Sequence, residues 1–381
     1  MFERFDDLLE RRDGSRWHRG NASDGIRAIL RSLVTTAARS APIAWRSITP
    51  GAPDEQIVMT GLRSVIFACS FATVVHAQAT ELPPPPGKLV DVGGRRLHLL
   101  CSGQGALTVI LEAGASSFAI DWTLVQREVE TTNRVCSYDR AGYGWSDSST
   151  ATTRATEAKD LNTLLRLAGE RPPYVMVGAS RGGLLIRAYA LDYPTDVAGF
   201  VFLDPATEDR LFTMLNGEAV VIASLTPDQL RSALPRQAVS VPRRAPQTGA
   251  PFDRLPPEHY QVRLELDKRL IASTPSMVTP EFIGTFQENE RALLARLLAS
   301  RSSPPQPVFG SRPTVVLTRG DEKNAGREEV HAALAKLSTN SRHSVIAGTG
   351  HEIHLFAPSA VSEAISDVVR SIRSKTALPA R

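Results

Sequence analysis

One short segment constrains the fold more than any other part of the sequence. The apolar run at residues 174–177 leads directly into Gly178-Ala179-Ser180-Arg181-Gly182, and a helical stretch follows that stops before Pro194. A strand that turns into a helix within so few residues needs small residues on both sides of the turn, because a Cβ atom there would meet the neighbouring chain. The segment therefore predicts a strand, a tight turn and a helix, with the Ser180 hydroxyl projecting from the carboxyl end of the strand.

From residue 88 onward, short apolar runs alternate with helical patterns. Apolar spacing favours helices at residues 156–168, 184–193 and 359–372. Such alternation predicts an α/β fold with a mainly parallel sheet that carries helices on both faces. The Gly93-Gly94 pair predicts a hairpin, so the sheet should open antiparallel. Seven strands are expected, at residues 95–101, 108–113, 134–138, 174–178, 199–203, 314–318 and 344–347.

One stretch lacks this alternation of strands and helices. Residues 206–307 contain many prolines and no convincing strand, but they show amphipathic helical patterns near 258–271 and 281–300. We interpret this stretch as a helical cap inserted into a core formed by residues 88–205 and 308–381.

The first 87 residues do not show the alternation of strands and helices that is expected from residue 88 onward. Residues 59–79 contain a basic residue, a short apolar run and a final Ala-Gln-Ala, which is the layout of a secretory signal peptide. Translation from Met59 would place this signal at the amino terminus, so residues 1–58 are interpreted as a leader or a mis-assigned extension. An arm packed on the domain is the alternative. Residues 80–87 read as a stiff proline-rich linker. The protein is expected to be periplasmic or secreted if the signal is used, and cytoplasmic otherwise.

Composition excludes several classes of function. The 44 Lys and Arg residues barely exceed the 40 Asp and Glu residues, and no basic block occurs, which argues against a nucleic-acid partner. No apolar run reaches the roughly 20 residues of a stable membrane span. No G-x-G-x-x-G opens a helix, so no nucleotide cofactor is expected. His351 and His354 are three residues apart instead of the four of a zinc motif, so no metal is expected either.

Three motifs carry a resemblance to a known family. Leu111-Glu112-Ala113-Gly114 follows one expected strand, residues 138–146 (YDRAGYGWS) follow the next, and the Ser180 turn follows the third. From Leu97 to Val369 the chain resembles the α/β-hydrolase fold family. The resemblance implies a mostly parallel eight-stranded sheet with helices on both faces and an inserted helical cap.

A serine hydroxyl is a weak nucleophile unless a base takes its proton. His351 lies on a glycine-flanked loop after the last expected strand, where this family places its catalytic base. His354, at the entry to the last helix, and His343, before the strand, are the alternatives. The sequence thus predicts that Ser180 and His351 form the reactive pair.

A carboxylate should orient the imidazole and stabilise its cation. Asp321 follows the strand at 314–318 and gives the chain order Ser180, Asp321, His351 that is expected of this fold. We therefore favour Asp321 as the acid. Asp204, which follows the preceding strand, is the alternative, and Glu322 is a lesser one.

The resemblance also implies an oxyanion hole made by the backbone N–H groups of Ala115 and Arg181. This sequence has Ala113 and Ala179 where the family often has histidine, so hydrogen bonding around the hole should differ. The Arg181 side chain either binds a substrate carboxylate or pairs with a nearby acid, and we favour the pair.

Two further features are interpreted through the resemblance. Asp139 and Arg140 are expected to form a structural turn with internal ion pairing, outside the site. The strands of Cys101 and Cys136 are expected to be neighbours, so a disulfide is open to them in an oxidising compartment, with two buried thiols as the default.

The sequence therefore predicts a serine hydrolase that cleaves a carboxylic ester or related acyl substrate, a small molecule, through an acyl-enzyme. An aminopeptidase or amidase of the proline iminopeptidase type is the alternative, and a non-catalytic ligand-binding protein is a remote one. An aminopeptidase would bind the substrate amine with acids of the cap, for which the candidates are Glu258, Glu265, Asp267, Glu281, Glu288 and Glu290.

Overall fold

The computed structural model describes residues 82–148, 154–208, 212–215, 218–300, 307–321 and 325–380. The expected leader at 1–58, the expected signal peptide at 59–79 and the first residues of the expected linker lie outside the described residues.

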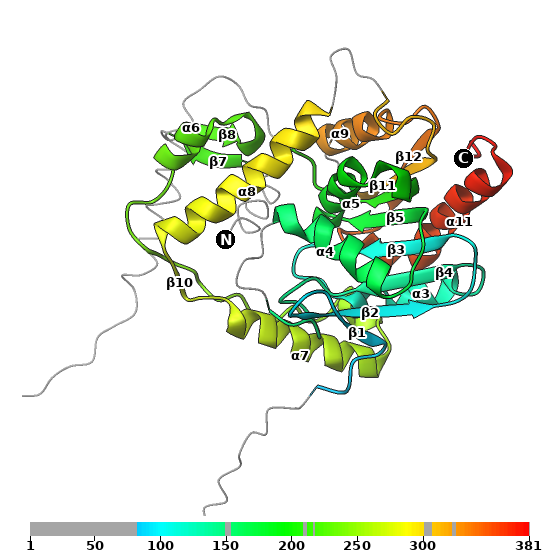
Figure 1. Cartoon of the computed structure of the whole chain (residues 1–381), viewed down its shortest axis with the longest axis horizontal. Helices are drawn as coiled ribbons and strands as arrows, with labels where there is room; N and C mark the ends of the chain where they lie inside the picture. The colour runs from blue at the N-terminus through cyan, green and yellow to red at the C-terminus, as the bar shows by residue number, and fades with distance from the viewer. Residues whose placement is uncertain are drawn as a thin grey trace, which may run out of the picture. The chain divides into compact units, whose positions relative to one another are not determined.

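An eight-stranded sheet forms the centre of the described chain (Figure 1). Its order is β1-β2-β4-β3-β5-β6-β11-β12. β2 runs antiparallel to both of its neighbours, and every other neighbouring pair is parallel. The predicted α/β fold, mainly parallel sheet and opening hairpin are thus confirmed. The strands are β1 (Lys88–Asp91), β2 (Arg96–Ser102), β3 (Thr108–Glu112), β4 (Arg134–Tyr138), β5 (Tyr174–Ala179), β6 (Val197–Leu203), β11 (Thr314–Gly320) and β12 (Ser341–Ala347).

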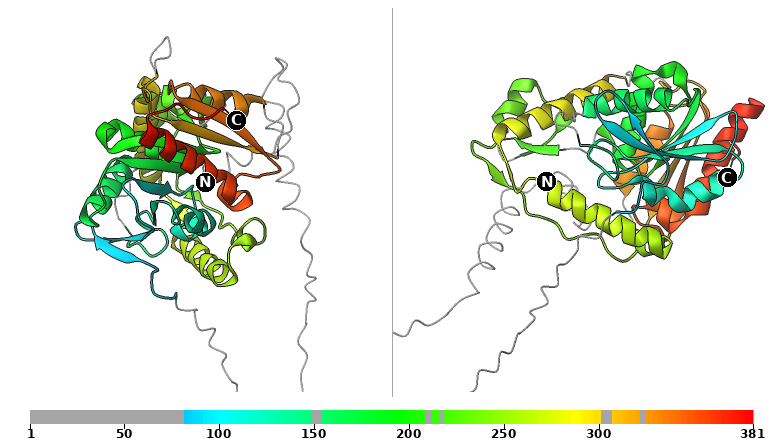
Figure 2. Two further views of the ribbon diagram at one scale, coloured as in Figure 1. Left: turned by 90° about the vertical axis from the view of Figure 1, so that its right-hand side faces the viewer. Right: turned by 60° about the horizontal axis from the view of Figure 1, so that its bottom comes forward.

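Helices cover both faces of this sheet, as Figures 1 and 2 show. α4 (Arg154–Leu167), α5 (Arg181–Asp192) and α9 (Ala325–Ala335) contribute to one apolar cluster, and α3 (Thr123–Val129) and α11 (Pro358–Ser374) contribute to another. Because helices shield both faces, β3 and β5 are buried at every position. This burial explains why the sequence shows the strands as continuous apolar runs and not as alternating patterns.

Among its described residues, the inserted segment contains three α-helices, α6 (Pro227–Ser232), α7 (Pro257–Ser273) and α8 (Pro280–Ala299). Proline occupies the first position of each, where no intrahelical N–H bond is lost. Thr226 and Thr279 cap α6 and α8 by accepting hydrogen bonds from backbone N–H groups.

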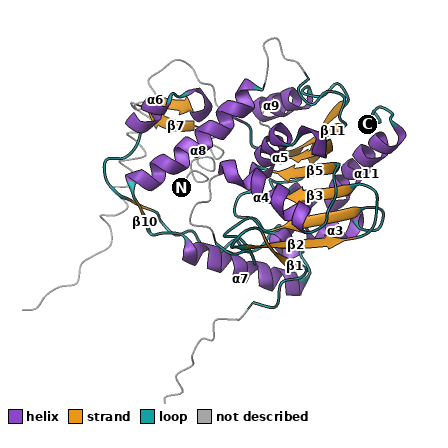
Figure 3. Ribbon diagram, in the orientation of Figure 1, coloured by secondary structure: helices purple, strands orange, loops and turns teal. Residues whose placement is uncertain are grey.

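The same segment also contains strands, which the sequence analysis missed (Figure 3). β7 (Phe212–Leu215) pairs with β8 (Glu218–Val221), and β9 (Val239–Ser240) pairs with β10 (Met277–Val278). Strands of two to four residues are too short to produce a periodic pattern. Across the described ranges, no helix is long and apolar enough to span a bilayer.

A buried ion pair joins α7 to the segment that follows β3. The Arg263 Nε atom of α7 lies 3.1 Å from Oδ1 of Asp121, in the 3₁₀ helix η1 (Ala119–Trp122) that precedes α3, and neither side chain is exposed. Arg263 also donates to the backbone and side-chain oxygens of Gln247 and stacks 3.5 Å from the centre of the Phe252 ring. Removing one partner of a buried ion pair lowers the free energy of unfolding by about 3–5 kcal/mol. α7 is therefore held firmly against the segment after β3.

Cys101 and Cys136 lie directly opposite each other on β2 and β4 and form a disulfide. The default of two free thiols was wrong. The sequence could not show which residues of the two strands face each other, because that register depends on the whole sheet.

Reduction of this disulfide should lower the free energy of unfolding by about 3–4 kcal/mol, the chain-entropy expectation for a closed loop of this length, since the cysteines are 35 residues apart. The measurement is denaturant unfolding of the oxidised and reduced protein, with a C101A/C136A variant as a second comparison. Equal stabilities in the oxidised and reduced states would contradict the prediction.

Candidate functional site

The predicted turn places Ser180 in a conformation that few residues other than glycine adopt. Its backbone has φ 50° and ψ −120°, between the end of β5 and the first residue of α5. Hydrogen bonds from Ser180 N–H to Leu203 O (2.9 Å) and from Ala206 N–H to Ser180 O (2.9 Å) fix the turn against the end of β6. The half-buried Ser180 side chain thus sits at the carboxyl edge of the sheet, at the amino terminus of α5, where the helix dipole favours negative charge.

The two glycines of the turn are required by close backbone approach. A Cβ atom on Gly178 would lie 2.7 Å from the carbonyl of Gly182, and one on Gly182 would lie 2.4 Å from the carbonyl oxygen of Glu112. Both contacts are with backbone, which cannot rotate away.

Gly182→Ala should therefore lower the free energy of unfolding by about 1–3 kcal/mol, the usual cost of overpacking. Gly114→Ala is the matched control, because a Cβ there would make only ordinary contacts of 3.5 Å or more. Thermal unfolding of the two variants tests this, and equal midpoints would contradict it.

His351 hydrogen-bonds to Asp204. The distance from His351 Nδ1 to Asp204 Oδ2 is 2.6 Å. A carboxylate oxygen accepts, so Nδ1 carries the proton and Nε2 is left free for another partner. Asp204 follows β6, which pairs with β5 so that Leu203 lies opposite Ala179. Ser180 and Asp204 therefore follow adjacent strands at the same edge of the sheet.

Asp321 is not the hydrogen-bond partner of His351, although the sequence analysis favoured it. The Gly320 and Asp321 N–H groups donate to Thr349 O (3.2 and 3.0 Å) and so anchor the His351 loop to the end of β11. The Asp321 side chain is 41% exposed and lies 3.7 Å from Arg319 Nε. β6 lies next to β5 and β11 lies one strand farther away, so the alternative acid Asp204 occupies the position nearer Ser180. Glu322 lies outside the described residues.

The charges around this pair favour an ionised carboxylate. Burial raises the pKa of Asp204, but the hydrogen bond and charge of His351, together with the charge of Arg327, outweigh it and hold that pKa well below its usual range. Burial lowers the pKa of His351, but the hydrogen bond and charge of Asp204 raise it by more, to above the ordinary 6.5. Asp204 is thus ionised at neutral pH, and it supports the protonated form of His351.

Two arginines near Asp204 escaped the sequence analysis. Arg327 of α9 donates from Nη1 to Asp204 Oδ2 (2.9 Å), and Arg319 Nε lies 3.6 Å from the same oxygen. Both arginines are buried. The one signal in the sequence is an arginine within an amphipathic helical pattern, but nothing in the sequence indicates which acid that arginine contacts.

Two backbone N–H groups are available near Ser180. A Cβ on Gly114 would lie 3.5 Å from Ser180 Cβ, so the segment after β3 borders the turn. Within the described ranges, no hydrogen-bond acceptor contacts the N–H of Ala115 or of Arg181. These are the two donors that the sequence analysis assigned to an oxyanion hole.

The Arg181 side chain pairs with an acid, as favoured. Its Nη2 atom lies 2.5 Å from Glu157 Oε2 on α4, and both side chains are almost fully buried. The guanidinium therefore joins α5 to α4.

Asp139 and Arg140 contact neighbouring elements instead of each other. Asp139 accepts from the Ala119 N–H (2.8 Å) and bonds to His98 Nδ1 (2.7 Å), while Arg140 pairs with Glu112 (2.6 Å). The prediction of an ion pair between Asp139 and Arg140 is thus wrong. Both residues instead brace the segment that follows β3.

The other histidines considered have different surroundings. His354 is buried against Trp122, with ring centres 4.7 Å apart, and burial first, then His351 and Arg263, lowers its pKa to about 3. His343 bonds to Thr318 Oγ1 (2.8 Å) on β11. Among the described residues, Cys101, Cys136 and Glu170 have metal-ligand spacing, but the disulfide leaves no thiolate there to bind an ion.

Two of the six acids proposed for an amine site, Asp267 and Glu265, contact polar groups of the same inserted segment. Asp267 pairs with Arg244 and accepts from the Gln247 N–H (2.8 Å), and Glu265 lies 3.6 Å from Lys268 and Arg269.

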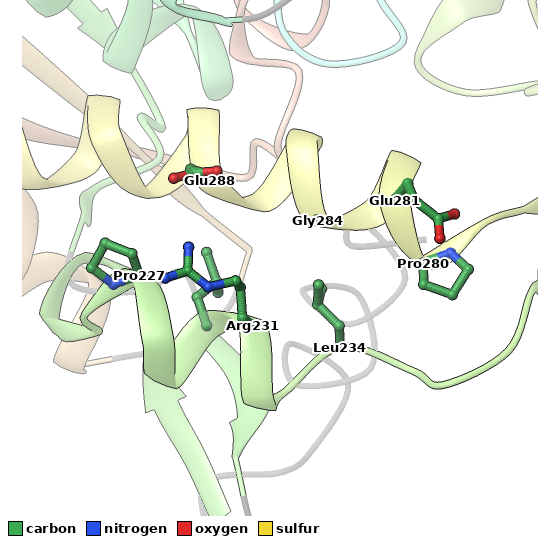
Figure 4. Close-up of a pocket in the computed structure, with 8 residues that line it drawn as sticks. Pro227, Arg231, Leu234, Pro280, Glu281, Gly284 and Glu288 are labelled. Atoms are coloured by element: carbon green, nitrogen blue, oxygen red, sulfur yellow. The ribbon is translucent and has the colours of Figure 1, made fainter.

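A groove of about 260 Å³ lies between α6 and α8 (Figure 4). Its lining comes entirely from these two helices and their flanking residues, none of which belongs to the carboxyl edge of the large sheet. We therefore do not assign this groove to the chemistry at Ser180. The lining residues are Pro227, Leu230, Arg231, Leu234, Pro280, Glu281, Gly284 and Glu288.

Comparisons with known proteins identify the fold of this chain. A family model described as alpha/beta hydrolase fold matches residues 108–358. The chain is 36% identical over 129 residues to the probable transporter efuK of Hormonema carpetanum, a match that covers 32% of this chain but only 18% of that protein. It is 25% identical over 272 residues to the uncharacterized protein YqjL of Bacillus subtilis (strain 168), covering 70% of this chain and 85% of that protein.

A thermophilic esterase from Thermogutta terrifontis, solved with malate bound, superposes with a TM-score of 0.51. The match covers 75% of this chain and 98% of that chain at 20% identity. At this identity the likeness concerns the fold alone.

Proposed function

The chain belongs to the alpha/beta hydrolase fold family, and on that premise we propose that it is a serine hydrolase that cleaves a small carboxylic ester through an acyl-enzyme. Ser180 is the nucleophile, His351 the general base and Asp204 the acid that orients it. The backbone N–H groups of Ala115 and Arg181 form the oxyanion hole.

The reaction proceeds in two halves. His351 Nε2 takes the Ser180 proton as the hydroxyl oxygen attacks the ester carbonyl, and the two backbone donors stabilise the tetrahedral oxyanion. The C–O bond to the alcohol breaks, and His351 returns the proton to the leaving alkoxide. Water then attacks the acyl-enzyme with His351 again as base, and the acid product and free Ser180 form.

The observation that carries this proposal is the 2.6 Å contact between His351 Nδ1 and Asp204 Oδ2 beside the Ser180 turn. It fixes the tautomer that leaves Nε2 able to accept a proton, and it supports the imidazolium that forms during attack. A histidine held in the opposite tautomer could not act as a base through Nε2.

Labelling with a fluorophosphonate probe tests the proposal. We expect the wild type to be labelled and to hydrolyse members of a p-nitrophenyl ester series faster than proline p-nitroanilide. Preference for proline p-nitroanilide would replace the esterase with the aminopeptidase. Absence of both labelling and turnover would leave a non-catalytic binding protein and overturn the proposal.

We also propose that the protein is exported through the segment at residues 59–79. The Cys101–Cys136 disulfide supports this, because structural disulfides persist mainly in oxidising compartments. Amino-terminal sequencing of the protein from its native host tests the proposal. We expect a chain that begins after Ala79, and a chain that retains Phe2 would contradict it.

A further inference from the structure

We propose that Arg140, a residue outside the triad, positions and polarises the Ala115 N–H of the oxyanion hole. The inference rests on the proposed function and adds to it a positioning residue that acts through the backbone.

Arg140 donates hydrogen bonds to two consecutive backbone carbonyl groups in the segment after β3. Nη1 donates to Ala113 O (2.7 Å) and Nη2 donates to Gly114 O (2.5 Å), while Nη1 also pairs with Glu112 Oε1 (2.6 Å). The side chain is 4% exposed, and its guanidinium lies 4.8 Å from the centre of the Tyr143 ring. Arginine presents a rigid planar fork, so these contacts fix orientation as well as distance.

The contact with Gly114 O determines where the Ala115 N–H points. Gly114 C=O and Ala115 N–H belong to one planar peptide group, in which the two bonds of a trans peptide point in opposite directions. When Arg140 holds the carbonyl, it therefore turns the amide hydrogen to the opposite side. Gly114 borders Ser180, and among the described residues the Ala115 N–H has no acceptor of its own.

The same contact strengthens the donor. A cation bound to the carbonyl oxygen withdraws electron density from its peptide group, and hydrogen bonds in such a chain polarise one another. The interaction with an oxyanion gains most from this, because that oxygen carries charge only in the transition state. Arg140 should therefore affect the chemical step more than the binding of the substrate.

The neighbouring residue holds the other end of the segment. Asp139 accepts from the Ala119 N–H (2.8 Å), five residues beyond Gly114. Two consecutive residues after β4 thus brace the chain from Ala113 to Ala119.

The test compares Arg140→Met and Arg140→Lys with a matched control, Arg187→Met. Arg187 is also a buried arginine paired with a glutamate, Glu208, and it lies farther along α5 from Ser180. Each variant is assayed for kcat and KM on a p-nitrophenyl ester and for inhibition by a trifluoromethyl ketone, whose adduct with serine places an oxyanion in the hole. Thermal unfolding is measured in parallel.

For Arg140→Met we expect kcat to fall ~10²-fold, the low end of the loss for a deleted oxyanion donor. KM should change little, and the inhibition constant of the ketone should rise by the same factor as kcat falls. Arg140→Lys retains the charge without the fork and should lose less. Arg187→Met should lose thermal stability but keep its kcat.

Three results would overturn the inference. The first is a folded Arg140→Met variant with unchanged kcat and inhibitor affinity. The second is an equal loss of kcat in Arg187→Met at equal thermal destabilisation. The third applies if Arg140→Met does not fold, and it is an Arg140→Lys variant in which both kcat and the inhibition constant of the ketone equal those of the wild type. A wild type that reacts with neither the ketone nor the fluorophosphonate would instead overturn the proposed function.

Discussion

Replacing Ser180 with alanine should lower kcat by ~10⁶-fold on any ester that the wild type hydrolyses, the loss typical of deleting a serine nucleophile. The hydroxyl is the only atom group removed, and the strained turn that presents it has its own backbone hydrogen bonds to Leu203 and Ala206. The fold should therefore survive, and residual rate should come from the oxyanion donors alone. The measurements are ester hydrolysis and fluorophosphonate labelling, with intact mass to locate the adduct.

Ser273→Ala is the control, because Ser273 is an exposed residue of α7 whose hydroxyl donates to Leu270 O (2.9 Å). Its variant should keep both activity and labelling. Labelling that persists in Ser180→Ala would show that another residue reacts, and the assignment of the nucleophile would then be wrong.

Asp204→Asn should lower kcat by ~10⁴-fold, because an amide in place of the carboxylate stabilises the wrong tautomer and no longer supports the imidazolium. Asp321→Asn should stay within a few-fold of the wild type, since the partly exposed Asp321 carboxylate makes no hydrogen bond to His351. The paired substitutions are assayed together, with thermal unfolding as a control for folding. A large loss in Asp321→Asn and a small one in Asp204→Asn would contradict the structural assignment.

The pH profile gives a second readout for the same pair. The base must be neutral, so kcat/KM should rise with pH as His351 loses its proton, with a midpoint above 6.5 because Asp204 raises this pKa. Asp204→Asn removes the group that raises it, while burial and the charge of Arg319 still lower it. The acid limb of the variant should therefore move to lower pH. A midpoint unchanged by Asp204→Asn would show that the carboxylate does not act on His351.

Much of the site could be predicted because local rules determine it. The Ser180 turn requires glycine at two positions where a Cβ would strike backbone, and a lone histidine on a glycine-flanked loop after the last strand has few alternatives. The parallel sheet and its opening hairpin likewise follow from patterns within single segments.

Local rules could not decide which of the two candidate acids is the partner of His351. Asp204 and Asp321 both follow apolar strands, and both lie between Ser180 and His351 in the chain, so chain order does not distinguish them. The choice depends on which strand lies next to β5, and the sheet order that settles it is a property of the assembled fold. The roles of Arg140 and Arg327 were missed for the same reason, because each acts on a residue that is distant in sequence.

The ion pair between Arg263 and Asp121 limits how the cap can open. Both side chains are fully buried, so drawing α7 away from the core would separate Asp121 from Arg263, which would keep only its contacts with Gln247 and Asp267 of its own segment. The Arg263 end of the inserted segment is therefore fixed to the core. Any opening that moves α7 away from the segment after β3 must therefore first break this pair.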